Sequence, residues 1–318
     1  MLRDPISCNK NCNTNNLYEY DPYGFDDNGN CIIDLTWWKS LTDYTKDLIT
    51  ERVDNKFTLT DITVPHKVYK DNKDKKLLTI YQSYIDGFDY NIWYNSNIPD
   101  GPKNTIIIPI SNILKDILLN CHQTNSMDYN KELTDFKKII TNSIKPNQQY
   151  FIRLSGTSGK NEKSVRPFIN VTDIIKHITS VKLFADQEYK RDKITCLILI
   201  PWNEQIDSRY EFRIFVVNNK LTAISSQFIE LFQYSAEELD TIEYALSNIQ
   251  FLNNTPYNTF IGDTYIDMDT KTCHLIELNP FGAHCGAGSA LFNWAVDYDI
   301  LYGKTDTVKF RYMSVINY

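Results

Sequence analysis

"GDTYIDMDTKTCHLIELNPFG", residues 262–282, has the pattern of a β-hairpin. Apolar and β-branched residues on both sides of the polar run 269–271 predict two antiparallel strands joined by a turn. If Thr270 lies at the centre of that turn, Asp263 pairs with Glu277, because both are equally distant from it. The hairpin therefore predicts two carboxylates that face each other across neighbouring strands.

An amide extends this pair of acids. Asn279 lies two positions after Glu277, so both side chains share a face of the strand, which must stop at Pro280. Two opposed acids repel unless a cation lies between them. Oxygen donors of this kind suit Mg²⁺, which shares its coordination sphere with substrate phosphates. We expect Asp263, Glu277 and Asn279 to bind Mg²⁺, and the alternative is a solvated strand face with a chance acid pair.

A second hairpin precedes this one. In "RYEFRIFVVNNKLTAISSQF" (209–228), the Asn218-Asn219 pair predicts a tight turn, since Asn tolerates positive φ. Alternation along the first strand places Glu211 and Arg213 on one face. Arg213 is a candidate phosphate ligand, and the alternative is that it pairs with Glu211.

The stretch "YFIRLSGTSGKNEKS" (150–164) joins a short strand to a glycine-rich loop. It does not match the P-loop pattern, because Leu154 stands where the first glycine belongs and Asn161 where the Ser or Thr belongs. Such a loop can still wrap phosphates with backbone N–H groups, or it can be an ordinary turn. Arg153 and Lys160 supply cations at this point, unless Arg153 is only a surface residue.

The remaining patterns predict an α+β fold with antiparallel sheets, not a doubly wound dinucleotide fold. Residues 1–34 have the composition of a loop. A capping box, Ser235 with Glu238, opens a helix, and Asn170 or Thr172 lies near the N-cap of another. The predicted helices span 35–55, 110–120, 130–144, 170–181 and 235–250, and further strands span 105–111, 150–154 and 195–202.

The composition limits the class of protein. The 318 residues suffice for one large or two medium domains, and 42% are hydrophobic. The net charge of −7 disfavours general nucleic-acid binding. No apolar run is long enough to span a membrane, and the N-terminus lacks the apolar core of a signal peptide. The seven scattered cysteines suit a reducing compartment, so we expect a cytoplasmic protein.

Two of these stretches carry a resemblance to a known family. "YEFRIFVVNNKLTAIS" (210–225), followed by residues 262–282, resembles the cell division cycle protein 123 (D123) family. The resemblance implies an ATP-grasp fold with two lobes, antiparallel sheets and a nucleotide bound between the lobes. It also implies an N-terminal lobe at 1–148, matched loosely, and an ATP-grasp core at 149–318, divided into a small lobe (149–200) and a large lobe (201–318).

The same resemblance implies an ATP and Mg²⁺ site. Its cofactor-binding residues would be Arg153, Lys160, Leu199, Ile200, Trp202, Glu211 and Arg213, and its metal ligands Asp263, Glu277 and Asn279. Members of the family assist the assembly of eukaryotic translation initiation factor 2, so a protein partner of that kind is expected.

The chain departs from the family pattern in three places. Gln227 stands where the family has an arginine, Gly159-Lys160-Asn161 stands where it has Pro-Lys-Asp, and the loop 282–289 is longer and rich in glycine. These departures leave open the alternative of an ATP-dependent ligase or nucleotide- or phosphoryl-transferring enzyme with a diverged acceptor. In that case backbone N–H groups of the glycine-rich loop would hold the acceptor.

Overall fold

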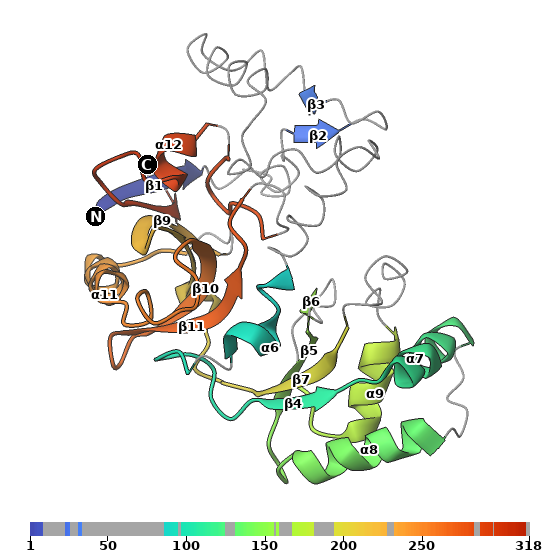
Figure 1. Ribbon diagram of the computed structural model, residues 1–318. Helices are drawn as coiled ribbons and strands as arrows, with labels where there is room; N and C mark the ends of the chain where they lie inside the picture. The colour runs from blue at the N-terminus through green and yellow to red at the C-terminus, as the bar shows by residue number, and fades with distance from the viewer. Residues whose placement is uncertain are drawn as a thin grey trace. The chain divides into compact units, whose positions relative to one another are not determined.

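The computed structural model of the chain is shown in Figure 1. It forms two compact units, which we describe separately. Unit 1 contains residues 1–87, 98–100 and 205–318, and unit 2 contains residues 88–97 and 101–204. The residues that the structure describes are 1–8, 23–25, 31–33, 86–94, 97–124, 131–155, 157–158, 167–180, 194–227, 232–282, 287–294 and 296–315.

The division into units differs from the expected lobes at one end. The expected boundary at 200/201 lies close to the observed one, after Glu204. The expected boundary at 148/149, however, falls inside unit 2. The reason is that strand β4 (Ile106–Pro109) pairs with strand β7 (Cys196–Pro201), so residues before 148 belong to the same sheet as those after it.

Unit 2 is built on a four-stranded antiparallel sheet. Its strand order is β4-β7-β5-β6, with β5 at Tyr150–Leu154 and β6 at Thr157–Ser158. Its helices are α6 (Tyr90–Trp93), α7 (Asn112–Thr124), α8 (Lys131–Ser143) and α9 (Val171–Ser180). The predicted strands and the three predicted helices of this region are confirmed.

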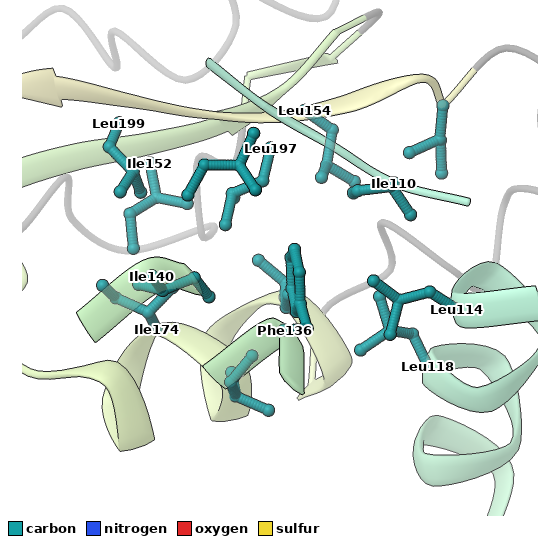
Figure 2. Packing of buried hydrophobic residues seen from close by; sticks show 14 of the residues in the cluster. Ile110, Leu114, Leu118, Phe136, Ile140, Ile152, Leu154, Ile174, Leu197 and Leu199 are labelled. Atoms are coloured by element: carbon teal, nitrogen blue, oxygen red, sulfur yellow. The ribbon is translucent and has the colours of Figure 1, made fainter. Parts of the chain in front are cut away.

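The core of unit 2 lies between the sheet and helices α7, α8 and α9. Strands β5 and β7 point fully buried aliphatic side chains toward the helices. These side chains pack against apolar residues that recur at helical spacing along the helices. The backbone N–H of Asp173 donates to Asn170 Oδ1 at 2.8 Å, so Asn170 caps α9. The residues labelled in Figure 2 are Ile110, Leu114, Leu118, Phe136, Ile140, Ile152, Leu154, Ile174, Leu197 and Leu199.

Unit 1 is built on a six-stranded sheet of order β1-β12-β9-β8-β10-β11. The pairs β9-β8, β8-β10 and β10-β11 are antiparallel, as predicted, whereas β1-β12 and β12-β9 are parallel. The strands are β1 (Leu2–Cys8), β8 (Glu211–Val217), β9 (Lys220–Ser226), β10 (Phe260–Asp267), β11 (Thr272–Asn279) and β12 (Lys309–Val315).

The prediction of a loop over residues 1–34 is wrong for two parts of that stretch. Residues 2–8 form β1, an edge strand held by β12, and β2 (Tyr23–Phe25) pairs with β3 (Cys31–Ile33). Local sequence favours no strand at 2–8, because it contains Asp4 and Pro5. An edge strand tolerates such residues, since one of its sides needs no hydrogen bonds. The predicted helix at 35–55 lies outside the described residues.

Short-range signals in unit 1 are confirmed. Asn218 and Asn219 both adopt positive φ, 52° and 61°, in the turn between β8 and β9. Helix α11 (Ala236–Ser247) begins with the predicted capping box of Ser235 and Glu238. The described part of the unit also contains two short helices, η4 (Ser208–Tyr210) and α12 (Tyr298–Leu301). No helix among the described residues is long and apolar enough to cross a membrane.

Candidate functional site

The hairpin of β10 and β11 brings the two predicted acids together. Asp263 pairs with Glu277, as the sequence predicts. Thr264 pairs with Leu275, however, so Ile276 is the extra residue of a β-bulge. The turn is therefore centred half a residue before Thr270, and the bulge restores the predicted register beyond it.

The acids belong to a row of polar residues that crosses five strands of unit 1. Residues that are opposite one another in a sheet share a face. The register pairs Arg311 with Ser225, Ser225 with Arg213, Arg213 with Asp263, and Asp263 with Glu277. We call these five residues the polar row.

Arg213 and Asp263 form a bidentate ion pair at the centre of the polar row. Arg213 Nε donates to Asp263 Oδ1 at 2.8 Å, and Nη2 donates to Oδ2 at 3.0 Å. Each side chain is only 9% exposed. Two parallel hydrogen bonds make this one of the stronger pairings that a carboxylate can form. In the part of the chain that the structure describes, Arg213 is therefore a cation held beside the acid pair.

Asn279 completes the predicted donor set. Its Nδ2 lies 3.4 Å from Asp263 Oδ2, and it is half-buried, as is Glu277. The two carboxylates and the amide thus lie on one face within one hairpin, which is the chemistry that Mg²⁺ prefers. The set fits the metal with one condition: Arg213 must release at least one oxygen of Asp263. The described residues contain no group of three or more His, Cys, Asp or Glu side chains that could hold a metal ion.

A backbone segment, Gly288–Leu291, is tied to the polar row by three hydrogen bonds. Arg213 Nη1 donates to the carbonyl of Gly288 at 3.2 Å, and the N–H of Leu291 donates to Ser225 Oγ at 3.0 Å. Arg311 Nη1 donates to the carbonyl of Leu291 at 3.3 Å. The segment begins at Gly288, inside the glycine-rich loop 282–289, so the described end of this loop contacts the polar row.

A second bidentate ion pair anchors the end of this segment. Arg311 Nη1 and Nη2 lie 2.6 Å and 2.9 Å from the two oxygens of Asp297. The guanidinium also lies 4.3 Å from the centroid of the Phe292 ring. Sequence reasoning missed this pair. Strand β12 carries the arginine, and its position beside β9 is a long-range feature that no local pattern encodes.

The cofactor residues predicted in unit 2 have different environments. Arg153 is buried and lies 4.8 Å above the Tyr90 ring, so the alternative of a surface position is wrong. Leu199 is fully buried in the core, whereas Ile200 and Trp202 are half-buried. Lys160 lies outside the described residues.

Glu211, the remaining predicted cofactor residue, begins β8 in unit 1. It is half-buried and pairs in register with Tyr265, whose ring stacks on His274 with 4.9 Å between centroids. The carbonyl of Glu211 accepts from the N–H of Gln227 at 3.0 Å. Glu211 and Arg213 therefore lie on the same face, as alternation along the strand predicts.

Comparisons with known proteins agree with this architecture. The D123 family profile matches residues 160–316. A CDC123-like protein of Acanthamoeba polyphaga mimivirus is 31% identical over 186 residues, which are 52% of this chain and 55% of the viral protein. A protein of the yeast Vanderwaltozyma polyspora named translation initiation factor eIF2 assembly protein is 25% identical over 112 residues, 34% of this chain and 30% of its own length. The chain thus spans about half or less of these relatives.

A solved structure shows the same fold. C-terminally truncated Cdc123 from Schizosaccharomyces pombe superposes with a TM-score of 0.58 at 18% identity, covering 73% of this chain and 97% of that one. At this identity the likeness concerns the fold alone. Together with the family match over residues 160–316 and the signature residues of β8, β10 and β11, it shows that this part of the chain is similar to the D123 family and that the chain has the fold of Cdc123.

Proposed function

We propose that the chain is an ATP- and Mg²⁺-binding assembly factor that acts on a protein partner like translation initiation factor 2. The observation that carries the proposal is the register of the polar row. It gathers Arg213, Asp263 and Glu277, from three strands of the chain, on one face of one sheet. The names of the relatives support the assembly role, although the chain covers only part of their length.

Each side chain has a separate task in this proposal. Arg213 would bind phosphate oxygens, for which its planar fork is suited. Asp263, Glu277 and Asn279 would hold Mg²⁺, which neutralises phosphate charge when bound. The family resemblance also predicts nucleotide contacts for residues of unit 2, namely Arg153, Lys160, Leu199, Ile200 and Trp202, of which Leu199 is fully buried in the core of that unit.

Co-purification with defined partners tests the assembly role. The tagged chain is mixed with separately expressed subunits of eukaryotic translation initiation factor 2, with and without ATP and Mg²⁺. We expect one subunit to be retained, and more of it when both ligands are present. Glu277→Gln serves as the matched variant, because it removes one charge from the site without changing side-chain size. Retention of no subunit under any condition would contradict the assembly role.

A further inference from the structure

Asp263 has two competing uses in the polar row. It is a proposed Mg²⁺ ligand, yet both of its oxygens are held by Arg213 at 2.8 Å and 3.0 Å. Both side chains are 9% exposed, so little water screens the pair. The affinity of the Asp263 carboxylate for a metal ion is lower while the guanidinium is bound to it, because two cations would then share one anion.

We propose that the Arg213–Asp263 ion pair couples metal binding to nucleotide binding. Without a nucleotide, Arg213 keeps divalent metal off Asp263. A phosphate group takes over the guanidinium, and the released carboxylate then joins Glu277 in binding the metal. This inference rests on the proposed ATP and Mg²⁺ site, and it adds that free metal binds poorly in the absence of phosphate.

Arg213 can exchange the carboxylate for a phosphate because both anions accept hydrogen bonds from an arginine in the same way. A guanidinium forms the same two parallel hydrogen bonds with a phosphate as with a carboxylate. Arg213 also donates from Nη1 to the carbonyl of Gly288, 3.2 Å away. That bond does not involve Asp263, so it can hold the guanidinium in place while the other two bonds change partner.

Among the described residues, the polar row offers Asp263 no second strong cation. Arg311, the other arginine of the polar row, is separated from Arg213 by Ser225 and is itself bound to both oxygens of Asp297. On the other side, Glu277 adds negative charge next to Asp263. Removal of Arg213 alone therefore leaves two adjacent carboxylates, which is a metal site without the competing charge.

Arg213→Met tests the coupling by removing the charge while keeping an unbranched side chain. Mn²⁺ replaces Mg²⁺, and free Mn²⁺ is counted by electron paramagnetic resonance in the absence of nucleotide. We expect the variant to bind Mn²⁺ at least about tenfold more tightly than the wild type, because a like charge beside the site is gone. Mn²⁺ alone should also raise the melting temperature of the variant and not that of the wild type.

Two further variants separate this effect from a general loss of charge. Arg311→Met breaks the other bidentate pair, but its partner Asp297 is the N-cap residue of α12 and has no carboxylate paired with it in the register of the sheet, so nucleotide-free Mn²⁺ binding should stay at the wild-type level. Adding Glu277→Gln to Arg213→Met should abolish the gain. If Arg213→Met does not fold, Arg213→Lys is used, since lysine keeps the charge but cannot form the fork, and a smaller gain is expected.

The results distinguish this inference from the proposed function. If the wild type binds ATP with Mg²⁺ but Arg213 variants bind nucleotide-free Mn²⁺ no better than it does, the coupling is wrong and the site remains. The coupling is equally wrong if the wild type binds nucleotide-free Mn²⁺ as tightly as Arg213→Met. If the wild type binds no ATP with Mg²⁺, the proposed site fails, and the coupling fails with it.

Discussion

Replacement of Asp297 by Asn should destabilise unit 1 strongly. The side chain is 8% exposed and accepts two hydrogen bonds from Arg311, whose own side chain is 18% exposed. Removing one partner of a buried pair typically costs about 3–5 kcal/mol, because the remaining charge is left uncompensated. Since some water reaches Arg311, we expect a loss near the lower end, about 3 kcal/mol in the free energy of unfolding.

A second ion pair in the same region provides the control. Asp299 lies 3.6 Å from Lys304, and their side chains are 52% and 56% exposed. An exposed pair of this kind contributes little, so Asp299→Asn should cost about 0.5 kcal/mol or less. Both variants lose one carboxylate charge from the same stretch of chain, which isolates the effect of burial.

Urea unfolding followed by pulsed hydrogen exchange measures both variants. The β12 peptide reports on unit 1, and a peptide from α8 reports on unit 2, where neither variant should have an effect. Equal losses from Asp297→Asn and Asp299→Asn would refute the reasoning, as would a loss confined to unit 2.

Three further predictions concern the site, the helix cap and a buried thiol. Glu277→Gln should weaken ATP binding only when Mg²⁺ is present, whereas Arg213→Ala should weaken it with or without metal; calorimetry under both conditions shows the difference, and equal losses would make Glu277 structural. The backbone hydrogen bond from Ser235 lowers the pKa of Glu238. This bond therefore stabilises the folded chain above the unfolded-state pKa of Glu238, and its contribution is lost as pH falls through the lower, folded-state pKa. The stability of Glu238→Gln to acid unfolding should depend less on pH in that range, and an unchanged profile would contradict this. Burial raises the pKa of Cys273 to about 12, so iodoacetamide at pH 8 should leave this thiol unmodified in the folded chain and modify it in urea. Peptide mass spectrometry measures both. Fast labelling of the folded chain would contradict this and show that strand β11 opens.

The features predicted well from the sequence are those that neighbouring residues determine. The Asn218-Asn219 turn follows from the tolerance of Asn for positive φ, and the start of α11 follows from the reciprocal bonds of Ser235 and Glu238. The pairing of Asp263 with Glu277 was also predicted by counting around a short turn, and it holds because the bulge at Ile276 offsets the half-residue shift of the turn centre. In each case the interacting residues are close in sequence.

The features that were missed depend on distant segments. Strand β1 exists because β12, some 300 positions later, supplies its hydrogen bonds, and nothing in residues 2–8 favours a strand. The Arg213–Asp263 pair depends on the register between β8 and β10, which are separated in the chain by β9 and α11. The sequence predicted phosphate as the ligand of Arg213 and Mg²⁺ as the ligand of Asp263, because it could not determine that the two residues lie opposite each other.

Calorimetric titration of the whole chain with ATP, in the presence and absence of Mg²⁺, tests the central claim most directly. We predict saturable heat with both ligands, weaker binding with ATP alone, and a higher melting temperature at saturation. Ligand at 100 times its dissociation constant should stabilise the folded chain by about 2.7 kcal/mol, which a melting curve resolves. Saturating ATP with Mg²⁺ that gives neither heat nor a melting shift would contradict the claim that this chain binds a nucleotide.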